Sequence, residues 1–129
     1  MTGKPAVASH PSSRHAAGMR LPLLLLVASA VGAAEPTFAT HIQPLLTERC
    51  SKCHGAEKQK GELRLDSLEA VLKGGENGAV VVAGKPEASP MIELISKPKS
   101  DADRMPPKGE PLAAEQVDLL RRWIAAGAK

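Results

Sequence analysis

The chain has 129 residues, which allows one domain and a targeting segment, and its formal net charge is +3. Three of its 17 basic residues (Lys4, Arg14 and Arg20) and none of its 14 acidic ones precede residue 35, so the remainder is formally neutral. Because the remainder shows no clustered basic patch, these figures exclude a nucleic acid as the partner.

Residues 21–34 read LPLLLLVASAVGAA, an unbroken run of apolar and small residues that follows Arg20. A positive flank, a short apolar core and small residues at its end are typical of a secretory signal. The run has 14 residues, too few to span a bilayer comfortably. We therefore predict a signal peptide with an N-terminal extension over residues 1–34, cleaved near Ala33 or Ala34.

Residues 35–129 are predicted to form one periplasmic or otherwise exported domain without a stable membrane span. This segment contains only two aromatic residues, Phe38 and Trp123. A domain of this size buries a modest fraction of its surface and often needs a cross-link or a cofactor to supplement its core.

The first predicted helix covers residues 38–49. Its apolar residues are spaced four, three and one positions apart, which places them on one helical face. They are Phe38, Ile42, Leu45 and Leu46. Pro44 lies inside this pattern, and because proline has no backbone N–H, we expect the helix to be kinked or to come in two pieces.

Shorter signals follow in the middle of the chain. Asp66, with Glu69 three residues later, resembles a capping box that opens a short helix, and Gly74-Gly75 is expected to end it. Residues 79–83 (AVVVA) are rich in β-formers, but no partner strand is in view.

The last third of the chain predicts two helices separated by a loop. Ser89-Pro90 opens the first, with proline at the first helical position. Residues 97–111 are polar and rich in proline, and residues 113–126 form an amphipathic helix with Gly127 as its stop. The elements together predict a small all-α domain whose long loops need something to fill its middle.

Cys50-x-x-Cys53-His54 is the one strong chemical motif in the chain. Two thiols at this spacing can each form a thioether with a vinyl group on the edge of a haem, and the adjacent histidine can then bind the iron. We therefore predict one haem c per chain, attached through Cys50 and Cys53, with His54 as the proximal iron ligand.

Three other interpretations of the cysteine pair are weaker. A structural disulfide is possible in an oxidising compartment, but so short a ring stabilises a fold little. A thioredoxin-like redox pair favours a βαβ context, whereas this pair follows a helix. Zinc prefers four ligands, and after residue 34 the sequence offers only one further histidine, His41, and no second cysteine pair.

The distal iron ligand has three candidates after residue 34, namely His41, Met91 and Met105. Met91 begins an apolar helical stretch and is expected to pack in the core. His41 is expected to be a partly exposed helical residue. Met105 lies in a polar loop between an arginine and two prolines that restrict the backbone. We predict Met105 as the distal ligand, because His/Met ligation is the usual arrangement in cytochromes c.

Three segments resemble the cytochrome c-like domain of planctomycete-type secreted proteins, which follows the plan of class I cytochromes c. They are FATHIQPLLTERCSKCHG, GELRLDSLEAVLKGGENGAVVVAGKPEASPMIELI and RMPPKGEPLAAEQVDLLRRWIAAGA. The resemblance implies a class I cytochrome c-like fold, with N- and C-terminal helices packed around the covalent haem. We expect Phe38 and Trp123 to lie where these two helices cross.

Two axial protein ligands leave no open position for a substrate, so we predict an electron carrier rather than an enzyme. It would exchange single electrons with redox partner proteins that the sequence does not identify. The alternative is a haem-bearing docking or sensor module for a separate exported enzyme. The sequence offers no carboxylate pair, nucleophile–base pair or phosphate loop that would support independent catalysis.

Overall fold

The computed structural model describes residues 1–12, 18 and 34–129. The chain divides into two units, residues 1–31 and 32–129, and residues 1–12 contain no helix or strand. The apolar run of the predicted signal peptide lies outside the described residues, apart from Ala34. No helix in the described part of the chain combines the length and apolar character that a membrane crossing requires.

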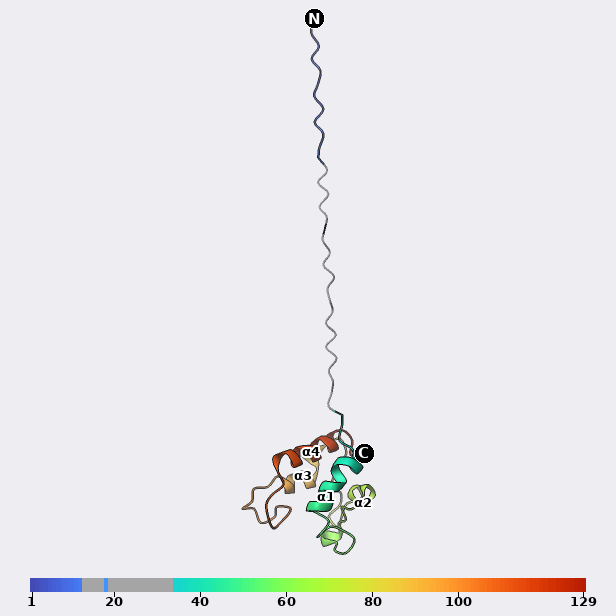
Figure 1. Ribbon diagram of the computed structural model, residues 1–129, viewed down its shortest axis with the longest axis vertical. Helices are drawn as coiled ribbons and strands as arrows, with labels where there is room; N and C mark the ends of the chain where they lie inside the picture. The colour runs from blue at the N-terminus through green and yellow to red at the C-terminus, as the bar shows by residue number, and fades with distance from the viewer. Residues whose placement is uncertain (13–17, 19–33) are drawn as a thin grey trace. The chain divides into compact units, whose positions relative to one another are not determined.

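Residues 34–129 form helices joined by long loops (Figure 1). In chain order the elements, with η for π or 3-10 turns, are η1 (Phe38–Ile42), α1 (Gln43–Arg49), η2 (Lys60–Glu62), α2 (Leu68–Lys73), η3 (Pro86–Ala88), α3 (Pro90–Ile95) and α4 (Ala114–Ala125). This segment contains no β-strand, only isolated bridges between His54 and Gln59 and between Gly75 and Gly78. The predicted all-α class is therefore confirmed for the described residues.

The first helix comes in two pieces, as Pro44 predicts. The first piece, η1, is a π-helical turn in which the amide of Gln43 donates to the carbonyl of Phe38, five residues back. The second piece, α1, begins at Gln43 and holds Pro44 in its first turn. A proline there costs no hydrogen bond, because the first amides of a helix have no intrahelical partner.

The core forms where η1 packs against α1 and α4, and where α3 packs against α4 (Figure 1). The rings of Phe38 and Trp123 are 5.7 Å apart between centroids and tilted by 42°. The Trp123 side chain is 1% exposed, and its Nε1 donates to the carbonyl of Lys129 at 2.9 Å. Phe38 and Trp123 thus join the first helix to the last, as predicted.

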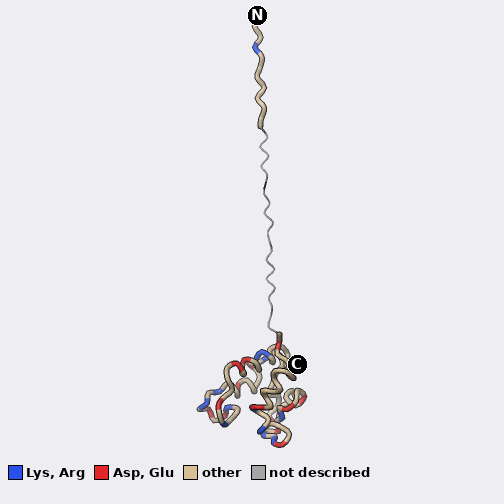
Figure 2. The backbone as a smooth tube through the Cα atoms, in the orientation of Figure 1, with Lys and Arg blue, Asp and Glu red and all other residues tan. Residues whose placement is uncertain are grey.

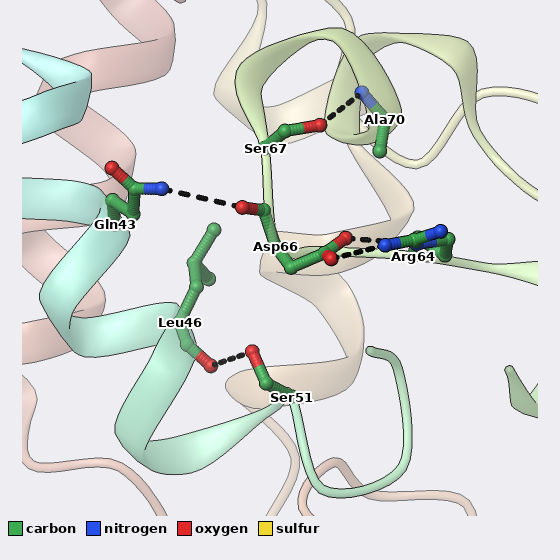
Figure 3. A network of polar contacts seen from close by, with 7 residues as sticks. All are labelled: Gln43, Leu46, Ser51, Arg64, Asp66, Ser67 and Ala70. Atoms are coloured by element: carbon green, nitrogen blue, oxygen red, sulfur yellow. Dashed lines mark hydrogen bonds and ion pairs between the residues drawn. The ribbon is translucent and has the colours of Figure 1, made fainter. Parts of the chain in front are cut away.

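The start of α2 corrects the predicted capping box by one residue (Figure 3). The amide of Ala70 donates to Oγ of Ser67 at 3.1 Å, so Ser67 is the N-cap. Asp66 instead accepts two hydrogen bonds from Arg64, at 3.0 and 2.5 Å. The prediction for Asp66 was wrong because a guanidinium two residues away engages both carboxylate oxygens, which leaves the cap to the neighbouring serine hydroxyl.

Residues 79–83 form no strand, because no described segment pairs with them. The segment instead packs along the start of α3. The carbonyl of Val80 accepts from the amide of Met91 at 2.9 Å, and the Ser89 hydroxyl accepts from the amide of Val82, also at 2.9 Å. Val81 is buried in the core. The β-rich composition therefore serves core packing.

The last helix has the predicted extent to within one residue at each end. Ala113 stands at its N-cap, and alanine has no side-chain oxygen that could accept a hydrogen bond. The cap therefore depends on the side chain of Gln116, whose Oε1 accepts from the backbone amide of Ala113 at 2.9 Å. Gly127, at φ +110°, follows the helix in the left-handed region that glycine adopts readily.

Acidic and basic residues are interspersed along the folded part of the chain (Figure 2). Several are paired on the surface, including Arg64 with Asp66, Lys99 with Glu110 and Arg121 with Glu87. The mixed distribution agrees with the neutral composition of residues 35–129.

Candidate functional site: an apolar cavity at the cysteine pair

The cysteine pair lies directly after α1. Cys50 caps this helix, and its amide donates to the carbonyl of Leu46 at 2.8 Å. The chain then turns back on itself, because the amides of Cys53 and His54 both donate to the carbonyl of Cys50, at 3.2 and 2.9 Å. This turn holds the two cysteines and the histidine in one compact segment at the end of the helix.

Gly55 makes the turn possible. A Cβ at this position would lie 2.3 Å from the carbonyl oxygen of Ser51, a distance that side chains do not tolerate. The turn is further fastened by the amide of Leu65, which donates to the carbonyl of His54 at 2.8 Å. Glycine after the histidine is therefore a requirement of close backbone packing.

A cavity of about 990 Å³ opens beside this turn. This volume lies at the upper end of the range of small-molecule and cofactor sites. The four predicted site residues, Cys50, Cys53, His54 and Met105, all line it. Apolar side chains supply much of the remaining wall, among them Leu46, Leu65, Ile95 and Leu120. The motif residues Cys50, Cys53 and His54 and the distant Met105 are thus brought to one apolar space.

Met105 reaches the cavity from the loop between α3 and α4. Its amide donates to the carbonyl of Leu94 at 3.0 Å, which ties the middle of the loop to α3. The Met105 side chain is partly buried against the core. Met91 is buried, as predicted, and it also lines the cavity. The cavity wall therefore offers two thioethers, one in a helix and one in a loop.

His41 does not reach the cavity. It is exposed in η1, and its Nδ1 accepts a hydrogen bond from the amide of Thr37 at 3.1 Å. The two histidines of the folded segment thus differ in their surroundings, since His54 lines the cavity and His41 faces solvent.

The residues at the cavity fit a haem. The Nδ1 atom of His54 is buried and has no hydrogen-bond partner among the described residues. A buried polar atom without a partner is costly, and such an atom is often found where a ligand belongs. An imidazole nitrogen and a thioether sulfur are the axial donors of cytochrome c iron, and both groups are present in this apolar space.

The donor set does not fit zinc. Zinc sites are built from three or four His, Cys, Asp or Glu ligands. In the described part of the chain, no three such residues are grouped closely enough to hold a metal ion. The nitrogen and sulfur donors of the cavity instead suit iron that is already held in a macrocycle.

The two cysteines form no disulfide with each other. Burial raises the pKa of the Cys50 thiol to about 11, despite the opposing effect of the Arg49 charge. Redox-active cysteine pairs have lowered pKa values, because the thiolate is the reactive form. The raised pKa therefore does not fit a thioredoxin-like function.

The charged residues that line the cavity are mostly basic. The basic ones are Arg49, Lys52, Lys58, Lys60 and Lys108, and the acidic ones are Glu48 and Glu110. A haem carries two propionate groups, and basic side chains at the wall would favour these carboxylates electrostatically. The cavity thus combines an apolar interior with a positive excess.

Sequence reasoning did not identify two further residues that shape this site. Gly55 was detectable, since glycine directly follows the histidine of the motif. Arg104 was noted only as a neighbour of Met105, and its burial, with 7% of the residue exposed, could not be inferred from a polar loop. The residues next to Arg104 in the sequence do not reveal that its side chain is buried.

Comparison with known proteins agrees with this site. Residues 50–109 match the model of a family described as Planctomycete cytochrome C. Neither the curated proteins nor the solved structures gave a match. The matched segment contains the cysteine pair, His54 and Met105. The predicted resemblance to the planctomycete-type cytochrome c domain is thereby confirmed over this segment.

Proposed function

We propose that this chain is an exported electron carrier with one covalent haem, which exchanges single electrons with protein partners. The observation that carries the proposal is the cavity, whose wall holds both cysteines, His54 and Met105. When bound, the haem supplies the Fe(II)/Fe(III) couple that a one-electron carrier needs.

Each site residue has a separate role in this proposal. The thiols of Cys50 and Cys53 form the thioether links that fix the haem to the end of α1. His54 would supply the proximal nitrogen, and Met105 would supply the distal sulfur from the loop between α3 and α4. The apolar wall excludes water, and methionine as the second ligand raises the reduction potential relative to a second histidine.

We also propose the export route and the absence of independent catalysis. The segment that precedes residue 35 has the layout of a secretory signal, and covalent haem attachment takes place outside the cytoplasm. With His54 and Met105 as the two ligands, the iron would have no vacant position at which a substrate could react.

The test of covalent attachment is a denaturing gel stained for haem. The protein is produced in a periplasm that contains cytochrome c maturation machinery, beside the single variants Cys50→Ala and Cys53→Ala and the double variant. We expect haem to stay with the denatured wild-type chain and to be absent from the double variant. A wild-type chain that folds without haem would overturn the proposal.

The test of function is reaction with carbon monoxide. We expect the reduced protein to bind it slowly or not at all, because Met105 occupies the distal position. Rapid binding would show an open or exchangeable position and would favour the sensor alternative over the electron carrier.

A further inference from the structure

Arg104 is a buried charged residue in the loop that carries Met105. Only 7% of its surface is exposed. No carboxylate of the described residues lies within ion-pair distance of it, although Lys97, Lys99, Arg64, Arg121 and Arg122 all have such partners. Burying a charge is costly unless hydrogen bonds compensate for the lost hydration. The groups that accept hydrogen bonds from the Arg104 guanidinium therefore indicate what this residue does.

The guanidinium of Arg104 donates to two backbone carbonyls of the same loop. Its Nη1 donates to Pro106 at 2.7 Å, and its Nη2 donates to Gly109 at 2.9 Å. Both are charge-assisted hydrogen bonds, the stronger kind. Because the two acceptors lie three residues apart, the planar guanidinium joins the two ends of the segment 106–109.

The segment 106–109 has little else to hold its shape. Within the described part of the chain, none of these four residues takes part in a backbone–backbone hydrogen bond. Two of them are prolines, which have no amide hydrogen to donate. Gly109 adopts φ +74°, a left-handed conformation. The Arg104 side chain thus supplies hydrogen bonds to this segment, in place of the backbone hydrogen bonds that hold a helix together.

Met105 and the segment 106–109 line the cavity, whereas Arg104 does not. Arg104 therefore supports this part of the cavity wall without forming its surface. The amide of Met105 is fixed to Leu94 at one side. The chain that leaves Met105 on the other side is fixed by Arg104, through Pro106 and Gly109.

We propose that Arg104 is a positioning residue that holds the Met105 thioether in place as the distal iron ligand. The inference rests on the proposed function, in which Met105 binds the iron. In this proposal the strength of that ligation depends on a guanidinium that does not line the cavity. A lysine cannot replace it, because one ammonium group on a flexible stem does not span two carbonyls in the fixed geometry of a guanidinium.

The test measures how readily imidazole displaces the methionine from the oxidised protein. The holo-protein, with its covalent haem, is titrated with imidazole, and the change in the haem absorption spectrum gives an apparent Kd. We expect Arg104→Met to lower this Kd about tenfold or more, because two charge-assisted bonds to the loop are lost. Arg104→Lys is expected to lower it by a smaller factor, and it serves where Arg104→Met does not fold.

Two further variants separate positioning from general destabilisation. Val71→Ala removes packing in α2, where Val71 is fully buried and does not line the cavity. We expect it to lower the thermal midpoint while leaving the imidazole Kd unchanged. Met105→Ala, which removes the ligand itself, should give the lowest Kd of the set.

The outcomes distinguish the inference from the function on which it rests. If Met105→Ala lowers the Kd and both Arg104 variants match the wild type, Arg104 is not a positioning residue and the proposed ligation stands. If Met105→Ala leaves the Kd unchanged, Met105 is not the ligand and both proposals fail. A Kd lowered equally by Val71→Ala would also overturn the inference, since loss of stability alone would then explain the effect.

Discussion

At the scale of single residues, the structure places two methionines at the wall of one cavity, and this makes a matched comparison possible. Met91 is held in α3 and buried in the core, and Met105 is held in the loop. The sequence favours Met105 as the distal iron ligand because two prolines restrict the backbone after it. The two methionine side chains themselves are chemically identical. Both can be exchanged for leucine, which preserves volume and removes the sulfur.

We expect Met105→Leu to lower the reduction potential by tens of millivolts or more and to keep the covalent haem, because the iron loses its thioether ligand. Met91→Leu is expected to leave the potential near that of the wild type, since only packing changes. Redox titration followed by absorption measures both. The reverse result, with Met91→Leu lowering the potential, would assign the distal position to α3.

At the scale of elements, the contact between Phe38 and Trp123 joins the two ends of the folded segment. Trp123 lies in α4 and meets Phe38 in η1, and it is almost fully buried. Replacement of a buried tryptophan by alanine leaves a cavity and typically costs about 3–5 kcal/mol.

We expect Trp123→Ala to lower the thermal midpoint by more than about 10 °C, because in a domain of this size each kcal/mol corresponds to about 4–8 °C. The control is Leu72→Ala in α2, whose leucine is 43% exposed, and it should change the midpoint little. Circular dichroism on heating measures both. An unchanged midpoint in Trp123→Ala would contradict the packing of η1 on α4.

The approach to α2 predicts a pH dependence. The two hydrogen bonds from Arg64 hold the pKa of the Asp66 carboxyl below its ordinary value. A carboxyl whose pKa is lowered in the folded state contributes stability above its unfolded pKa, and this contribution is lost as the pH falls through the folded pKa. The backbone carbonyl of Asp66 also accepts from Gln43 at 3.2 Å, which ties this segment to α1 (Figure 3).

We expect Asp66→Asn to be less stable than the wild type at neutral pH, by a small margin because the pair is on the surface. The difference should disappear in acid, where the wild-type carboxylate is protonated. Urea unfolding at several pH values measures this. A difference that persists in acid would show that asparagine disturbs the turn for another reason.

At the scale of the whole molecule, a large cavity occupies a small helical domain. The core contains only one phenylalanine and one tryptophan, and the helices α1, α2 and α3 have six or seven residues each. Helices this short are marginal by themselves, so packing must stabilise them. A bound apolar group that contacts several of these elements stabilises the folded state by mass action.

We expect the double variant Cys50→Ala/Cys53→Ala, purified without haem, to melt at least about 10 °C below the holo-protein and over a broader range. The expected reason is the loss of the contacts that the haem makes with the cavity wall. Calorimetry compares the two proteins. An equal midpoint and an equally sharp transition would show that the chain folds without its cofactor.

Much of this protein follows from local sequence patterns. The helical class, the break at Pro44, the starts and ends of α3 and α4 and the haem motif all depend on residues that are close together in the chain. The N-cap of α2 is Ser67, one residue after the predicted Asp66, because Arg64 engages the Asp66 carboxylate. The prediction of a signal peptide depends on residues 1–34 and stays a prediction.

What only the tertiary structure decided is which distant residues share one space. Sequence alone selects Met105 as a candidate, but only folding brings it to the cavity that Cys50, Cys53 and His54 line. Folding also buries Arg104 and directs its guanidinium to the loop carbonyls. The physical reason is that local conformation depends on neighbours in the chain, whereas burial and hydrogen bonding depend on segments that meet only after the helices pack.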